Sequence, residues 1–111
     1  MDKFTNVDFN FLGKLVHGKI SAFKAVIGEN PYPSWEESPQ HLKDVCIGGA
    51  RTALNADCTA KDIHDYWIDR MKAINPDHPS LVPFEELSVN EKIKDEIVVS
   101  TVKIYLKYLH E

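Results

Sequence analysis

Apolar residues recur at the spacing of an α-helix in four separate stretches of this chain, with prolines between the first two stretches and between the last two. Residues suited to capping a helix stand at the starts of these stretches, namely Asp8, Ser38, Thr59 and Ser88. Gly28 is placed to stop the first helix. The expected helices cover about residues 8–27, 38–55, 59–74 and 88–109. No stretch alternates as a strand does, so we predict a compact, mainly α fold of four principal helices with Pro-rich connecting loops.

The length and composition limit the classes of protein to which the chain can belong. Its 111 residues, 43% of them hydrophobic and 27% charged, fit one folded domain over 1–111. No apolar run reaches the roughly 20 residues of a membrane helix, and the start lacks a signal-peptide layout, so we expect a cytoplasmic protein without a membrane partner. The net charge of -4 argues against a nucleic-acid partner. Cys46 and Cys58 fit no zinc pattern and are expected to be buried thiols.

Two adjacent glycines, Gly48 and Gly49, lie inside the second expected helix. Each costs about 1 kcal/mol of helix stability relative to alanine. We therefore expect either a close approach of another element to the backbone at this point or a local kink.

Three short segments of the second half carry a recognisable pattern. Residues 64–67 read H-D-Y-W, residues 78–87 read H-P-S-L-V-P-F-E-E-L, and residues 91–92 read E-K. In these segments the chain resembles the RyR domain, the repeat named after the ryanodine receptor. That family shows H-x-x-W on a helix, then H-P-x-L-x-P-Y/F-x-x-L, then E-K and a long closing helix. The resemblance covers about residues 12–106.

The first half resembles single-domain members of the same family that phages and prophages encode. The matching residues are His17 in the leading helix, Trp35 with Pro39 four residues later, and the glycines of the second helix. The chain differs from many members between H-x-x-W and H-P, where only residues 71–77 replace a longer G-W-x-Y-G loop. The resemblance implies a phage-type protein in the host cytoplasm.

His64 and Trp67 lie three residues apart and therefore share one face of the third helix. An indole beside an imidazole can stack on and hydrogen-bond to a purine. The resemblance implies an adenine-nucleotide pocket at Trp67, as in the ryanodine-receptor repeats. The alternative is a core tryptophan with a histidine that only packs or caps.

Three further residues are candidates for the same ligand site. His78 either reaches the pocket of Trp67 or only shapes a rigid Pro-rich loop. Arg70 follows Trp67 by one turn and Arg51 lies on the preceding helix, so both are candidates to hold a phosphate, unless they are only solvated surface cations. Lys72 belongs to the same group of cations.

The sequence contains no recognisable catalytic or metal-binding arrangement. His64-Asp65 is reminiscent of a metal phosphohydrolase, but no spacing favours His41 and Asp95 as further ligands. There is no nucleophile motif and no glycine-rich phosphate loop. We therefore expect a non-enzymatic domain without a cofactor or metal that binds an adenine nucleotide, which a phage could use to sequester a nucleotide signal. The alternative is a protein-interaction module without a nucleotide ligand, with a surface formed by Phe9, Phe11 and Tyr108.

A two-fold homodimer is expected in solution. Ryanodine-receptor repeats pack in tandem pairs, and a single copy lacks that internal neighbour, while two-fold closure is the commonest solution for identical chains. Light scattering at tens of micromolar should give twice the monomer mass of 12.6 kDa. A mass equal to that of the monomer would contradict the expectation.

Overall fold

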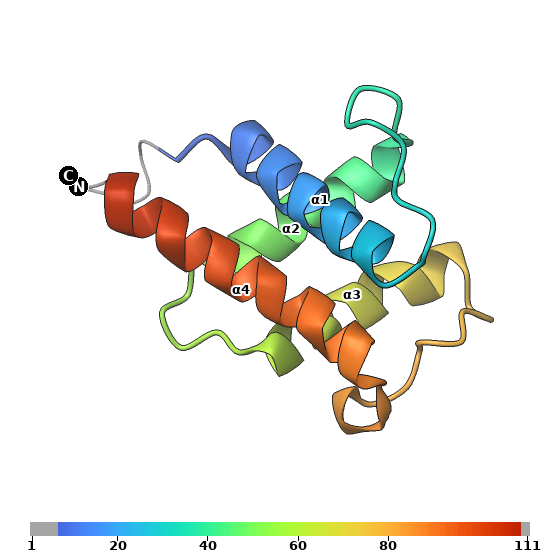
Figure 1. Cartoon of the computed structure of the whole chain (residues 1–111). Coiled ribbons are helices and arrows are strands. Elements are labelled where there is room, and N and C mark those ends of the chain that lie inside the picture. Colours follow the sequence, from blue (N-terminus) through green and yellow to red (C-terminus); the bar gives the residue numbers. More distant parts are fainter. Residues whose placement is uncertain (1–6, 110–111) are drawn as a thin grey trace.

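A computed structural model describes residues 7–109 of the chain (Figure 1). It contains four α-helices and one short 3-10 helix, and no strand occurs among the described residues. The helices are α1 (Phe9–Val26), α2 (Gln40–Thr52), α3 (Ala60–Ile74), the 3-10 helix η1 (Phe84–Glu86) and α4 (Val89–Leu109). The predicted mainly α fold of four principal helices is therefore confirmed. Over the described range, no helix combines the length and the apolar character that crossing a membrane requires.

Local capping interactions set the ends of three helices as expected. The Asp8 carboxylate accepts a hydrogen bond from the Phe11 N–H at 3.0 Å and so caps α1. Gly28 follows α1 with a φ of +83°, a conformation that suits glycine. At α3 the Asp62 carboxylate accepts from the Thr59 N–H at 2.9 Å, and at α4 the Ser88 hydroxyl accepts from the Glu91 N–H at 3.2 Å.

The start of α2 differs from the prediction, because Ser38 does not cap it. Pro39 occupies the N-cap position instead, and the helix begins at Gln40. The buried Ser38 hydroxyl donates to the backbone oxygens of the preceding loop, 2.9 Å from that of Ser34, and accepts from His17 Nε2–H at 3.0 Å. Ser38 therefore ties the Pro-rich loop to α1.

All four helices contribute side chains to one hydrophobic core. Its buried members are Leu12, Val16, Ile20, Ala50, Ala53, Cys58, Ile63, Val98, Val99 and Val102. Along α4, Val98, Thr101 and Val102 are buried, whereas Ile93, which precedes them at helical spacing, is exposed. Within this range both cysteines are free and buried, as predicted.

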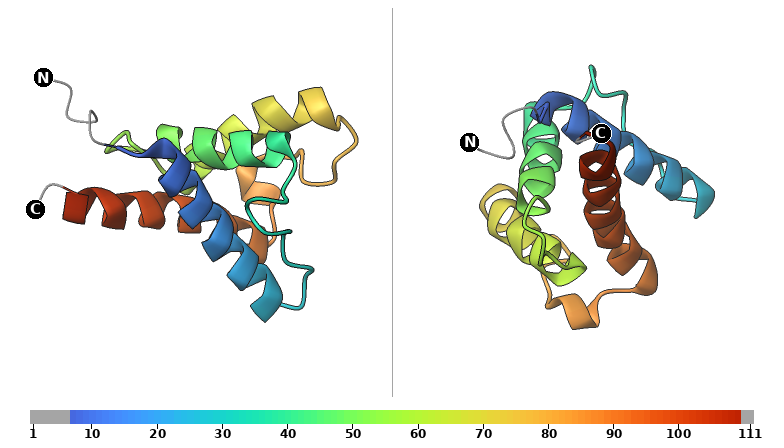
Figure 2. Two further views of the ribbon diagram at one scale, coloured as in Figure 1. Left: turned by 90° about the horizontal axis from the view of Figure 1, so that it is seen from above. Right: turned by 90° about the vertical axis from the view of Figure 1, so that its left-hand side faces the viewer.

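The helices α1 and α4 cross at an angle and separate toward an open end, which the end of α1 and the start of α4 form (Figure 2). At the opposite end the Tyr105 hydroxyl accepts a hydrogen bond from the backbone N–H of Asp8 at 3.2 Å. At the open end, the turn after α1 meets the start of α4 through the Glu29–Lys94 ion pair. Side chains of α1 and α4 near this open end line a cavity together with side chains of α2 and α3.

The paired glycines of α2 lie where neighbouring helices approach its backbone, as expected. A Cβ atom at Gly48 would collide with the ring and hydroxyl of Tyr66 from α3. At Gly49 a Cβ would lie 3.7 Å from Val98 of α4, an ordinary contact. The close approach at Gly48 therefore explains why a residue without a side chain is tolerated inside this helix.

Gly48→Ala and Gly18→Ala should have opposite effects on stability. Both positions lie inside helices, but a Cβ at Gly18 would meet nothing within 4 Å. Gly18→Ala should raise the free energy of unfolding by about 1 kcal/mol through helix propensity. Gly48→Ala should lower it by about 1–2 kcal/mol, because Tyr66 must move. Urea denaturation measures the free energy of unfolding of both variants. Equal stabilisation by the two substitutions would contradict the close contact between Gly48 and Tyr66.

Candidate functional site

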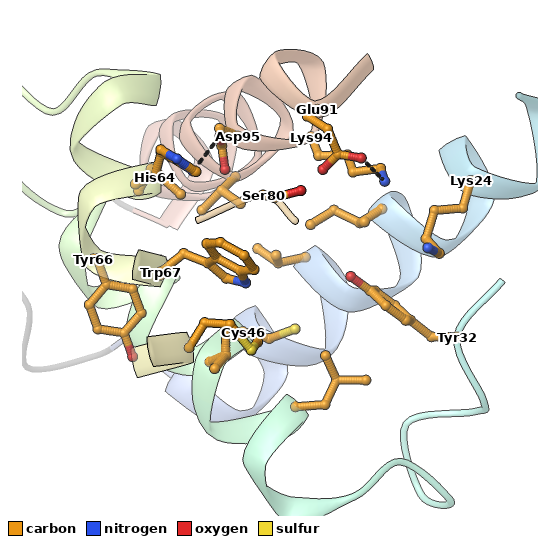
Figure 3. Close-up of a pocket in the computed structure, with 18 of the residues that line it drawn as sticks. Lys24, Tyr32, Cys46, His64, Tyr66, Trp67, Ser80, Glu91, Lys94 and Asp95 are labelled. Atoms are coloured by element: carbon orange, nitrogen blue, oxygen red, sulfur yellow. Dashed lines mark hydrogen bonds and ion pairs between the residues drawn. The ribbon is translucent and has the colours of Figure 1, made fainter. Parts of the chain in front are cut away.

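A cavity of about 580 Å³ occupies the space where α1 and α4 diverge (Figure 3). Residues of all four helices and of the two long loops line it. Its apolar lining includes Val16, Ile20, Leu42, Val45, Cys46, Ile63, Met71, Leu87 and Val98. The volume lies within the range of small-molecule sites, about 300–1,000 Å³, and an apolar lining that also holds polar side chains can both fill and orient a ligand.

Trp67 of α3 forms one wall of this cavity. The His64 ring stacks against its indole with centroids 5.6 Å apart and planes at 17°, and the His78 ring packs edge-on at 4.9 Å. The indole nitrogen is directed into the cavity (Figure 3). Its N–H donates no hydrogen bond to any of residues 7–109, so a donor is available to a molecule in the cavity.

His64 is held in one orientation by the loop before η1. Its Nε2 lies 2.6 Å from the backbone oxygen of Val82, and since a carbonyl can only accept, this nitrogen carries the proton. Its Nδ1 faces the Asp95 carboxyl, 3.9 Å from Oδ2. With both ring nitrogens directed at protein groups, His64 is a positioning element that ties the loop to α3 and orients Trp67.

Asp95 of α4 brings a largely buried carboxyl group to the cavity wall. Burial raises its pKa to about 7, and the neighbouring carboxylates of Glu91 and Glu96 act in the same direction, while Lys94 opposes them. None of residues 7–109 hydrogen-bonds to this carboxyl group. Asp95 can therefore donate a hydrogen bond to a ligand when protonated or accept one when ionised.

Two lysines mark the open end of the cavity, away from Trp67. Lys24 of α1 and Lys94 of α4 both donate to the Glu29 carboxylate, at 3.3 and 2.7 Å. Tyr32 lies beside them with its hydroxyl directed toward the cavity (Figure 3). Burial raises the pKa of this phenol, so it stays neutral and can donate a hydrogen bond.

The structure brings together three of the five predicted site residues. His64, Trp67 and His78 all line the cavity, as the shared helix face and the loop hypothesis require. Arg51 and Arg70 are exposed and do not line it, so they are not the cations of this pocket. The Arg51 guanidinium instead lies over the Phe9 ring at 4.0 Å.

Lys72, the other cation considered, is also exposed and pairs with Asp69 at 3.5 Å. The cations at the cavity are Lys24 and Lys94, which sequence reasoning did not select. The sequence of α4 does contain a pattern that could have identified its contribution to the site. Glu91 and Asp95 precede the buried residues Val98 and Val102 at helical spacing. Polar residues that continue an apolar stripe are expected to reach the interior.

The described residues offer no metal centre and no activated thiol at this site. No group of three or more His, Cys, Asp or Glu side chains within residues 7–109 is placed to hold a metal ion. Cys46 lines the cavity, but burial raises the pKa of its thiol to about 12, which disfavours the nucleophilic thiolate. The lining side chains can hydrogen-bond to a ligand, pair with its charges and contact it through aromatic rings.

Comparison with known proteins links the second half of the chain to a family. A family model described as "Domain of unknown function (DUF7701)" matches residues 50–106, just over half of the chain. The match includes α3, η1 and most of α4, and so His64, Trp67 and Asp95, but not Lys24 or Glu29. No curated protein and no solved structure matches the chain.

Asp95→Asn should stabilise the protein at neutral and higher pH. The unfolded carboxyl ionises near its ordinary pKa of about 3.9, and the folded one near 7, so wild-type stability should fall as the pH rises between these values. The variant should raise the free energy of unfolding by about 2–4 kcal/mol at about pH 8 and change it little at about pH 4.

Urea denaturation at the two pH values tests this expectation. Asp69→Asn is the matched control, because its carboxylate is exposed on α3 and lies outside the cavity. A gain from Asp95→Asn that is the same at both pH values would contradict a buried, destabilised carboxylate.

Proposed function

This chain belongs to the DUF7701 family, and we propose that it binds a small molecule with an aromatic heterocycle in the cavity between the helices without transforming it. The ligand that we propose is an adenine nucleotide. One observation carries the proposal: the indole N–H of Trp67 and the Asp95 carboxyl group are directed at the same cavity and have no hydrogen-bond partner among residues 7–109. No fully buried side-chain nitrogen or oxygen of residues 7–109 lacks a partner, so both groups are accessible from the cavity, where a ligand could hydrogen-bond to each.

Adenine has the complementary groups for this part of the cavity. Its ring nitrogens accept hydrogen bonds and its exocyclic amine donates them. The Trp67 indole can donate to a ring nitrogen while a carboxyl oxygen of Asp95 accepts from the amine. The planar base then fills the apolar space between Trp67 and Tyr32, which lie on opposite sides of the cavity (Figure 3).

Binding without catalysis is the reading that these side chains support best. His64 has Nε2–H committed to Val82 and Nδ1 turned to Asp95, so it has no free nitrogen for general base chemistry. The Cys46 thiol is held in its neutral form by burial. With the histidine held by protein groups and the thiol neutral, the free polar groups of the site, the Trp67 N–H and the Asp95 carboxyl, are suited to hydrogen-bonding a ligand.

We also propose that the chain is an RyR-like domain of the phage type. His64, Trp67 and His78, which carry the resemblance, lie around one cavity, which fits the nucleotide pocket that the resemblance implies. His17 also fits, because it packs between Tyr32 and Trp35 with ring centroids 5.1 and 5.4 Å away. On this proposal the protein sequesters a nucleotide in the host cytoplasm.

A second candidate function is protein interaction. Phe11, Ile104 and Tyr108 are exposed, and Phe11 lies against Tyr105 with ring centroids 6.0 Å apart. Exposed apolar side chains gathered at one end of a domain favour a partner surface, which a second copy of the chain could also use. Phe9 does not join them, because it is half-buried beneath Arg51.

Replacement of Trp67 tests the nucleotide proposal. Trp67→Ala should weaken adenosine monophosphate binding by about 1–3 kcal/mol, since both the aromatic contact and the N–H are lost. Trp67→Phe should cost about 0.5–1.5 kcal/mol, because it keeps an aromatic ring but loses the donor. Isothermal titration calorimetry measures both, with thermal melting to verify folding.

Trp35→Phe is the matched control, because Trp35 is buried in the Pro-rich loop outside this cavity. It should leave the affinity unchanged. Mass spectrometry of small molecules released from the denatured wild-type protein provides an independent check. A folded Trp67→Ala protein with wild-type affinity would contradict the assignment of Trp67 to the nucleotide site. If no purine is released and none binds, protein interaction becomes the better supported function.

A further inference from the structure

Two lysines from distant parts of the chain converge on one oxygen atom at the open end of the cavity. Lys94 Nζ lies 2.7 Å and Lys24 Nζ 3.3 Å from Oε1 of Glu29, although Lys94 and Glu29 are 65 positions apart in sequence. Two ammonium groups that share a single oxygen also suit a phosphate oxygen. All three residues line the same cavity as Trp67.

The three side chains differ in how far they are exposed to solvent. The side chains of Lys24 and Lys94 are 18% and 14% exposed, which is low for lysine, whereas that of Glu29 is 38% exposed. Glu29 belongs to the turn after α1 and directly follows Gly28 with its φ of +83°. The lysines are therefore fixed by the packed helices, while the carboxylate reaches them from the solvent side and can leave by rotation of its side chain.

While the Asp95 carboxyl group is neutral, which its raised pKa of about 7 favours below that pH, the charges around this point balance only with Glu29 in place. Lys94 also donates to Glu91 at 2.9 Å, so two lysines face two carboxylates. Departure of Glu29 leaves one uncompensated positive charge at the cavity. An anionic group that enters from the cavity side restores the balance, and the buried stems of both lysines remain where they are.

We propose that Lys24 and Lys94 form an anion subsite for a phosphate group of the ligand, and that Glu29 occupies this subsite as a built-in competitor until the ligand displaces it. The inference rests on the proposed function, because it assigns the phosphate end of a ligand whose base lies at Trp67. A subsite of two lysines matches one phosphate, so the ligand class is a nucleoside monophosphate. Glu29 then sets the affinity: a tethered carboxylate lowers the fraction of the protein that is open to the anion.

Glu29→Gln tests the competitor directly. The amide keeps the shape of the side chain but removes the charge that holds it on the lysines, so the affinity for adenosine monophosphate should rise about tenfold. Adenosine, which has no phosphate, should bind the variant and the wild type equally. Calorimetric titration of both ligands measures the two effects.

Glu36→Gln is the matched control. Glu36 accepts from Lys14 at 3.1 Å at a separate surface site and does not line this cavity. The substitution Glu36→Gln therefore removes one negative charge, as Glu29→Gln does, but away from the cavity. It should leave both affinities unchanged. If adenosine monophosphate binds the wild type, Glu29→Gln and Glu36→Gln equally well, the competitor role of Glu29 is overturned while the base pocket stands.

Inorganic phosphate tests the anion subsite in a separate experiment that does not depend on binding of the base. At matched ionic strength with chloride as reference, phosphate should raise the melting temperature of Glu29→Gln more than that of Glu36→Gln. If phosphate has this larger effect on Glu29→Gln but neither adenosine nor adenosine monophosphate binds, the anion subsite is supported and the adenine proposal is wrong. Equal phosphate effects on the two variants would overturn the subsite. Circular dichroism of Glu29→Gln verifies that the variant is folded, and Glu29→Ala should reproduce the same gain in affinity.

Discussion

The close contact between Gly13 of α1 and Ile47 of α2 sets how the other helices can pack. A Cβ at Gly13 would lie 2.5 Å from Ile47 Cγ1, so the two backbones approach more closely than side chains would normally allow. The helices α3 and α4 then complete the core around this pair, with Leu12, Ala50 and Val102 buried at its centre. Since α1 packs tightly along its first half, its second half diverges from α4, and the cavity occupies the resulting space (Figure 2).

The cavity is notable for the polar groups that it places against an apolar lining. At one end are the Trp67 indole N–H and the Asp95 carboxyl group, at the other Lys24 and Lys94 with their shared carboxylate. Keeping a carboxyl group such as Asp95 away from water costs stability, as its raised pKa reflects. A fold that needed only a stable core would be better served by an apolar residue there. This cost is the kind that proteins accept at sites where a ligand supplies the missing interactions.

Interactions between residues close in the sequence, such as helix caps, could be predicted from the sequence. Contacts between residues far apart in the sequence could not. The caps at Asp8, Thr59 and Ser88 act within one turn, and the helices that they start were predicted with nearly correct ends. Ser38 has the right residue type for a cap, but a tertiary hydrogen bond to His17 takes its hydroxyl. His64, Trp67 and His78 were found together because they share a helix face and its adjacent loop. Lys24 and Lys94 were missed because their meeting depends on how α1 and α4 cross, which no local pattern encodes.

The central claim is that a ligand enters beside Trp67, and the indole N–H itself reports on it. The two tryptophans each contribute one indole signal to a proton–nitrogen correlation spectrum of the labelled protein, and Trp67 and Trp35 lie at different sites. On addition of adenosine monophosphate, the account predicts that the Trp67 indole signal moves as a new hydrogen bond forms, while the Trp35 signal stays in place. A Trp67 signal that does not move at saturating nucleotide would contradict the account.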